Sequence, residues 1–140
     1  MSVSISMNGA WLPSIRGVLF DMDGTLLDSE PLTEASVDQL LERVGVTMDV
    51  DYPQLHGIPW QRIADYLRAR TSKLNDVDVE MELQTTFHRL LMEREPKPIL
   101  GSVEAVIAAA RKGSAAVVSS SNRISIDHVV ERLAVASVLD

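Results

Sequence analysis

Two short apolar runs, at residues 18–20 and 115–118, bracket a long stretch in which apolar residues recur every three or four positions. Each run is rich in strand-forming residues and stops abruptly at polar ones. A continuous apolar run of this kind predicts a strand that is buried on both faces of a parallel sheet, whereas the recurrence between the runs predicts helices. The pattern therefore indicates an α/β protein with two neighbouring strands and a helical insertion after the first.

The insertion, residues 29–96, contains no convincing strand. Pro31 suits the first turn of a helix that Asp28 or Ser29 caps and that Gly45 ends. Two more helices follow, and the second of these stops before a stiff Pro-Lys-Pro connector. The apolar positions expected on the inner faces of the three helices are Ala35, Leu40, Leu41, Val44, Ile63, Tyr66, Leu67, Val79, Leu83, Phe87, Leu90 and Leu91.

Helical periodicity resumes at residues 102–112, which we expect to link the insertion to the second strand, with Gly113 as the stop. A last helix is predicted at roughly residues 124–133. The organisation is therefore a partial doubly wound core interrupted by a helical cap. The expected boundaries are an N-terminal extension at 1–16, the core at 17–28 and 97–140, and the cap at 29–96.

Two carboxylates directly follow the first strand. Asp21 and Asp23 would emerge at the carboxyl end of that strand, where open α/β sheets bind ligands, and Gly24 lets the backbone turn sharply there. Neighbouring carboxylates repel each other unless a cation lies between them, and a site of oxygen ligands favours Mg²⁺. Two other interpretations are a calcium loop, which would need a later glycine and a preceding helix, and a solvated acidic turn without chemistry.

The segment 21–26, which reads DMDGTL, resembles the first signature of the haloacid dehalogenase superfamily, whose members are mostly Mg²⁺-dependent phosphohydrolases. The resemblance implies a Rossmann-like core and makes Asp21 the nucleophile that forms an aspartyl-phosphate. It makes Asp23 the general acid and then the general base. Both aspartates would hold the metal, Asp23 through its backbone carbonyl, and Gly24 and Thr25 would help to bind the phosphate.

The second strand also ends in hydroxyl residues, Ser119 to Ser121, followed by Asn122. In the family, a Ser or Thr at the end of this strand contacts the transferring phosphoryl group, and Ser119 matches that position. Ser120 would add a backbone N–H, and the positive end of the following helix would face the same phosphate. For Ser121 and Asn122 we favour plain capping of that helix.

An all-helical insertion after the first strand resembles the cap of the group that includes phosphoglycolate phosphatase and β-phosphoglucomutase. The loop at residues 55–59 resembles the cap loop that reads the substrate in these relatives, which implicates Gly57. Trp60 would face the leaving group or anchor the cap, and His56 suits a surface or hinge position. The mutase carries a histidine within the stretch matching residues 28–33, where this chain has none, and the dehalogenase proper lacks the second aspartate. Both differences favour hydrolysis of a small phosphorylated metabolite.

The composition of the chain limits the kinds of partner that it could bind. The net charge of −7 and the pI near 4.9 provide no basic patch for nucleic acid or an anionic membrane. No apolar run is long enough to span a membrane. The chain has no cysteine, which fits a reducing cytoplasm. The sequence does not settle the oligomeric state or the substrate.

Family phosphatases also carry a lysine that holds the phosphate and an acidic pair that completes the Mg²⁺ site, and both follow later strands. Neither has a counterpart here, because Val138 to Asp140 resemble the point just before a third core strand. We therefore expect the chain to be the N-terminal part of a longer phosphatase. The alternatives are a catalytically inactive binding or assembly module and a phosphotransferase similar to β-phosphoglucomutase.

Overall fold

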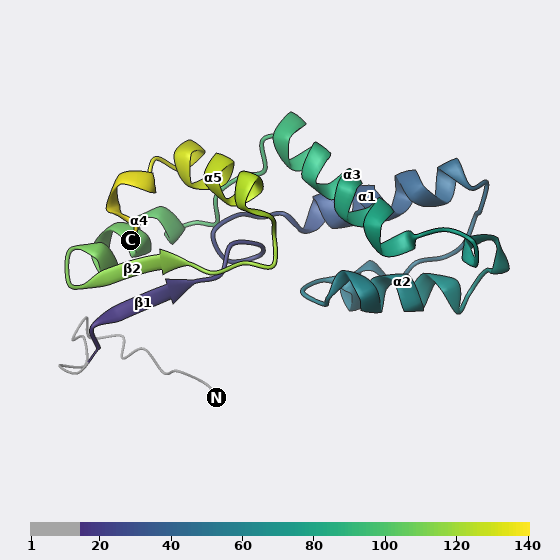
Figure 1. Cartoon of the computed structure of the whole chain (residues 1–140), viewed down its shortest axis with the longest axis horizontal. Coiled ribbons are helices and arrows are strands. Elements are labelled where there is room, and N and C mark those ends of the chain that lie inside the picture. Colours follow the sequence, from purple (N-terminus) through teal and green to yellow (C-terminus); the bar gives the residue numbers. More distant parts are fainter. Residues whose placement is uncertain (1–14) are drawn as a thin grey trace.

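The computed structural model describes residues 15–140, so most of the extension expected at 1–16 lies outside the described residues. The chain forms two lobes at opposite ends of an elongated molecule (Figure 1). One lobe holds the two strands and the helices α4 and α5, and the other holds α1, α2 and α3. This is the α/β core with a helical cap that the sequence predicts.

The two predicted strands form a parallel sheet. Strand β1 (Gly17–Phe20) pairs with β2 (Ser114–Val117), with Gly17 opposite Ser114 and Phe20 opposite Val117. The strands come very close together at the start of β2, where a Cβ on Gly113 would lie 2.3 Å from the carbonyl oxygen of Arg16. Only glycine fits this approach without a backbone shift.

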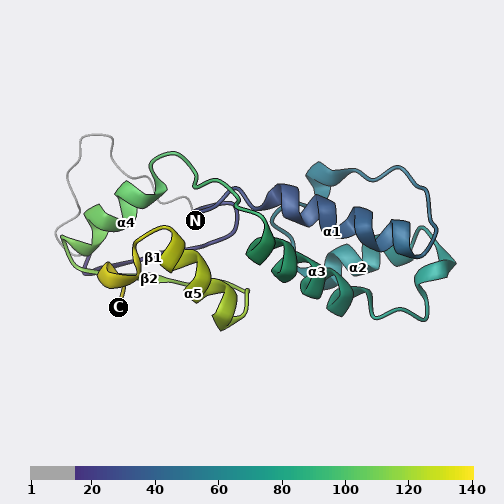
Figure 2. The same ribbon diagram turned by 90° about the horizontal axis from the view of Figure 1, so that it is seen from above.

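Helices α4 (Ser102–Ala110) and α5 (Arg123–Arg132) lie on the same side of the two strands (Figures 1 and 2). The other side is not covered by a described helix, and the Leu19 side chain is 71% exposed. The prediction that β1 is buried on both faces is therefore wrong for residues 15–140. Phe20, which points to the opposite face of the pleat, packs against the core cluster as expected.

Three helices make up the cap, and α1 and α2 both pack against α3. The apolar positions predicted for the third helix are all buried, because they recur with the helical period. The helices and the two short 3₁₀ turns of the cap are α1 (Glu30–Arg43), η1 (Tyr52–Leu55), α2 (Trp60–Arg68), η2 (Ser72–Leu74) and α3 (Val79–Glu93).

The two chain segments that connect the lobes are hydrogen-bonded to each other. The amide of Asp28 donates to the carbonyl of Lys97 at 2.9 Å, and the amide of Ile99 donates to the carbonyl of Leu26 at 3.0 Å. The hydroxyl of Ser102, at the start of α4, donates to the same Leu26 carbonyl at 3.0 Å. This pairing fixes where the cap enters and leaves the core.

Apolar packing also joins the lobes. One buried cluster belongs to the cap alone, whereas the other combines core residues such as Met22 and Val129 with Leu32, Phe87 and Leu91 of the cap. Trp60 packs against both clusters. The inner ends of α1 and α3 are thus held against the core, beside the carboxyl ends of the strands.

The last described residues reach the free edge of β2. The 3₁₀ turn η3 (Ala136–Val138) precedes them, and the amide of Asp140 donates to the carbonyl of Ala115 at 2.9 Å. Ser114 and Val118 direct their amides toward β1, so Ala115 directs its carbonyl to the opposite edge. Asp140 therefore lies at the edge of β2 that β1 does not occupy.

Candidate active site

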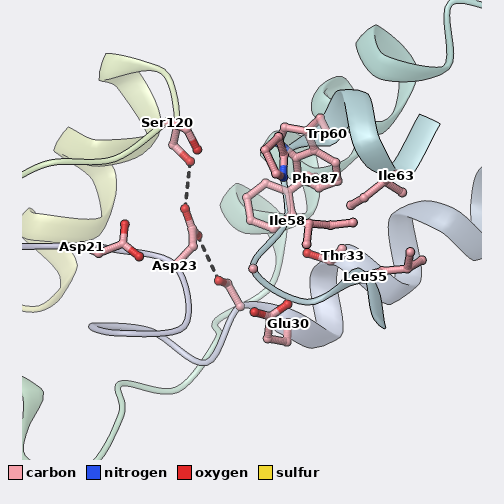
Figure 3. Close-up of a pocket in the computed structure, with 14 residues that line it drawn as sticks. Asp21, Asp23, Glu30, Thr33, Leu55, Ile58, Trp60, Ile63, Phe87 and Ser120 are labelled. Atoms are coloured by element: carbon pink, nitrogen blue, oxygen red, sulfur yellow. Dashed lines mark hydrogen bonds between the residues drawn. The ribbon is translucent and has the colours of Figure 1, made fainter. Parts of the chain in front are cut away.

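A tight turn follows β1 and presents both predicted carboxylates to one pocket. The side chain of Met22 is fully buried, and its carbonyl accepts the amide of Leu26 at 2.9 Å. Gly24 adopts a positive φ of 70°, and its amide donates to the carbonyl of Leu27 at 2.9 Å. Because Met22 points inward, its neighbours Asp21 and Asp23 both point to the pocket side (Figure 3).

Three serine hydroxyls surround the carboxylate of Asp23. The hydroxyl of Ser29 donates to Oδ1 at 2.9 Å, and those of Ser121 and Ser119 lie 3.1 and 3.4 Å from Oδ2. Such bonds fix the orientation of the side chain. The Asp21 carboxylate is exposed and accepts no hydrogen bond from residues 15–140. The structure therefore holds one carboxylate in place and leaves the other open to a ligand.

The end of β2 corrects one prediction about helix capping. Asn122 caps α5, since its Oδ1 accepts the amide of Ser125 at 2.9 Å. Ser121 does not cap the helix but directs its hydroxyl to Asp23. At the other helix, Ser29 occupies the N-cap position of α1 as expected, yet its hydroxyl also goes to Asp23 and makes no cap bond.

The wall opposite the carboxylates comes from the cap. Leu55, Ile58, Trp60, Ile63 and Phe87 give it an apolar surface, and the pocket encloses about 230 Å³ (Figure 3). The rings of Trp60 and Phe87 meet edge to face, with centroids 5.2 Å apart. Trp60 thus anchors the cap and also lines the pocket, and the prediction that it faces the leaving group stays a prediction.

The predicted cap loop reaches the pocket as well. Gly57 lines it with a positive φ of 69°, a conformation that side-chain-bearing residues rarely adopt. His56 faces away toward α1, where its Nε2 lies 2.9 Å from Oε1 of Glu34. This contact ties the loop to the first cap helix, and His56 lies outside the residues that line the pocket.

Some predicted residues lie outside the pocket, and some pocket residues were missed. Ser120 lines the pocket, whereas Ser119, Gly24 and Thr25 do not. Ser119 instead contacts Asp23, and Thr25 is exposed at the turn. The phosphate-binding roles of these three residues stay predictions. Glu30 and Thr33 line the pocket but were not predicted as site residues, because their spacing carries no separate signal.

Glu30 is partly buried at the start of α1. Burial raises the pKa of its carboxyl above 4.5, His56 lowers it, and the carboxylates of Asp23, Asp28 and Glu34 raise it further. Partial burial is thus the main reason that the pKa of Glu30 is raised.

A second polar contact connects cap and core beside the pocket. The Nδ2 of Asn122 lies 3.1 Å from Nδ1 of His88 on α3. Since the Oδ1 of Asn122 already accepts the helix amide, its Nδ2 is the donor and the imidazole nitrogen is the acceptor. Burial lowers the pKa of His88, and the nearby Asp23 carboxylate raises it by a smaller amount. The contact therefore requires the neutral imidazole.

The donor chemistry suits a hard cation. Asp21 offers an open carboxylate, and the pocket polar groups around it are oxygen atoms. Within residues 15–140 there is no group of three or more His, Cys, Asp or Glu that could hold a metal. The described residues thus fit one part of a Mg²⁺ site.

The family model for haloacid dehalogenase-like hydrolases matches residues 15–140. The chain therefore belongs to the haloacid dehalogenase-like hydrolase family. No curated protein is significantly similar to it in sequence. Among residues 15–140, none of the helices combines the length and the apolar character that crossing a bilayer requires.

Solved structures share the fold. The haloacid dehalogenase-like protein SP0104 from Streptococcus pneumoniae aligns with a TM-score of 0.75 at 14% identity, over 92% of this chain and 60% of its own. A predicted phosphoglycolate phosphatase from Haemophilus somnus aligns at 0.69 and 18%, over 89% and 60%. CbbY from Rhodobacter sphaeroides, solved with phosphate, aligns at 0.62 and 24%, over 84% and 56%. The chain spans 56–60% of the length of these structures.

Proposed function

We propose that the protein is a Mg²⁺-dependent phosphohydrolase that cleaves a small phosphate monoester through an aspartyl-phosphate on Asp21. The observation that carries the proposal is the contrast between two carboxylates on one pocket. Asp21 is open, whereas Asp23 is held by three hydroxyls within 3.4 Å. Family membership and the phosphate in a structural neighbour support the same chemistry.

In the first step, an oxygen of Asp21 attacks phosphorus and the bond from phosphorus to the leaving oxygen breaks. Asp23 donates its proton to that oxygen, so an alcohol leaves. In the second step, Asp23 takes a proton from water as the water attacks the phosphorus of the acyl-phosphate, which restores Asp21 and releases phosphate. Mg²⁺, held by Asp21 and the carbonyl of Asp23, would offset the charge of the phosphate against the nucleophile.

The serine hydroxyls suit both states of Asp23. A hydroxyl donates to the carboxylate and can rotate to accept from the protonated acid. The side chain can therefore change its protonation state without losing its position. The apolar wall with Trp60 and Phe87 limits water on the opposite side of the pocket.

The test is phosphate release from a panel of phosphate monoesters with and without Mg²⁺, using the gene product in its full natural length. Asp21→Asn is expected to abolish release, and Asp28→Asn, an exposed residue outside the pocket, is the matched control. Retained activity in Asp21→Asn contradicts the nucleophile assignment.

A second variant separates the roles of the two aspartates. Asp23→Asn is expected to slow turnover while Mg²⁺ affinity is largely retained, because the backbone carbonyl would be the ligand. Loss of Mg²⁺ affinity with unchanged turnover contradicts that role. If the wild-type protein releases phosphate from none of the esters, the inactive binding module becomes the better interpretation.

A further inference from the structure

The side chains that line the pocket carry charge of one sign. They include three carboxylates, those of Asp21, Asp23 and Glu30, and no lysine or arginine among the described residues. The proposed mechanism uses the first two. Glu30 is left over, on the boundary between the carboxylates and the apolar cap wall (Figure 3).

The carboxylate of Glu30 has no partner among residues 15–140. It accepts no hydrogen bond from a described group, and its Oε1 folds over the turn, 3.4 Å from where a Cβ on Gly24 would lie. The imidazole of His56 is hydrogen-bonded to Glu34 instead, with 2.9 Å between Nε2 and Oε1. A carboxylate that is partly removed from water and lacks a donor gains most from a ligand that brings one.

We propose that Glu30 selects the leaving group: it accepts a hydrogen bond from a hydroxyl of the substrate and rejects substrates with a second anionic group. The inference rests on the proposed phosphatase function. With phosphate at Asp21, the remainder of a small ester extends toward Glu30, Thr33 and the apolar wall. A substrate hydroxyl in this position can donate a hydrogen bond to the Glu30 carboxylate. A substrate carboxylate or second phosphate would instead be repelled by the negative charge of Glu30, and no described lysine or arginine lines the pocket to offset it.

Two matched substrate pairs test this selection. Hydroxyethyl phosphate and phosphoglycolate differ only in a terminal CH₂OH or carboxylate, and so do glycerol 3-phosphate and 3-phosphoglycerate. In each pair we expect the hydroxyl form to have the higher kcat/KM by about tenfold or more, since like charges at short range cost at least that much. The ratio within a pair cancels effects on the common phosphoryl step.

Two variants test whether Glu30 is the residue that selects between the substrates. Glu30→Gln is expected to lower the ratio by about tenfold, because its amide can also donate to a carboxylate. Glu42→Gln removes the same charge from the exposed far end of α1, outside the pocket, and should leave the ratio unchanged.

The possible failures are distinct. If p-nitrophenyl phosphate and both hydroxyl esters are not hydrolysed, the proposed function fails and the selection falls with it. If esters are hydrolysed but the carboxylate forms are equal or better, the selection is wrong while the phosphatase function stands. An unchanged ratio in Glu30→Gln likewise overturns the role of Glu30.

Discussion

Replacement of Gly113 by alanine should weaken the core at one defined contact. The added Cβ would lie 2.3 Å from the Arg16 oxygen, whereas real Cβ contacts rarely fall below 3.0–3.4 Å. The strands must therefore separate locally by roughly 1 Å, which breaks the 2.9 Å bond from the Ser114 amide to the same oxygen.

The cost can be worked from these two effects. A lost backbone hydrogen bond costs about 0.5–1.5 kcal/mol and overpacking about 1–3 kcal/mol. Alanine also lowers the conformational entropy of the unfolded chain, which stabilises the folded state by about 0.4–1 kcal/mol. We expect the free energy of unfolding to fall by about 1–3 kcal/mol. Urea unfolding followed by circular dichroism measures it, and Lys112→Ala, an exposed neighbour, should stay within about 0.5 kcal/mol. A Gly113→Ala midpoint equal to that control would refute the reasoning.

Three further outcomes follow from the described contacts. The stability contributed by neutral His88 is complete above the unfolded-state pKa of 6.5 and is lost as pH falls toward its lower folded pKa. A series of thermal melts across this pH range should show the loss, and His88→Gln, which removes the titrating group, should flatten it. Leu83→Ala, at a fully buried site, should lower the free energy of unfolding by about 2–5 kcal/mol, against less than about 0.5 kcal/mol for the exposed Met81→Ala, as measured in urea. Ser29→Ala should slow phosphate release by about tenfold without loss of helical circular dichroism, because its hydroxyl serves the carboxylate and not the helix; unchanged turnover would contradict this.

The cap was the most predictable part of the fold. Its helices bury one face each, and residues such as Leu83 and Leu90 recur with a period that the sequence displays directly. Pro31 and Gly45 likewise marked the two ends of the first helix to within a few residues. Local signals suffice here because the structure they specify is itself local.

The strands and the site depended on contacts that are distant in sequence. The apolar run of β1 indicated a strand buried on both faces. A local run of apolar residues does not show which other elements cover each face, and Leu19 is exposed among the described residues. The close approach at Gly113 also needs both strands to be placed first. The sequence predicted that β1 and β2 would be neighbours, and this is confirmed.

The aspartate pair was found from its position after a strand, whereas its surroundings were not. Ser29 and Ser121 are 92 positions apart in the printed sequence, and the fold brings both hydroxyls onto Asp23. Each residue also occurs where a helix cap is common, so the local interpretation competed with the correct one. Glu30 was hidden in the same way, at the first position of a helix where an acidic residue is ordinary.

The most direct test of the account is to trap the covalent intermediate. The full-length protein is mixed with a hydrolysed ester and Mg²⁺, quenched in acid within a turnover, digested and analysed by mass spectrometry. We predict an acyl-phosphate on the peptide that contains Asp21, sensitive to hydroxylamine and absent from Asp21→Asn. A phosphoryl group on another residue, or rapid phosphate release with no trapped intermediate under any quench time, would contradict the assignment of Asp21 as the nucleophile.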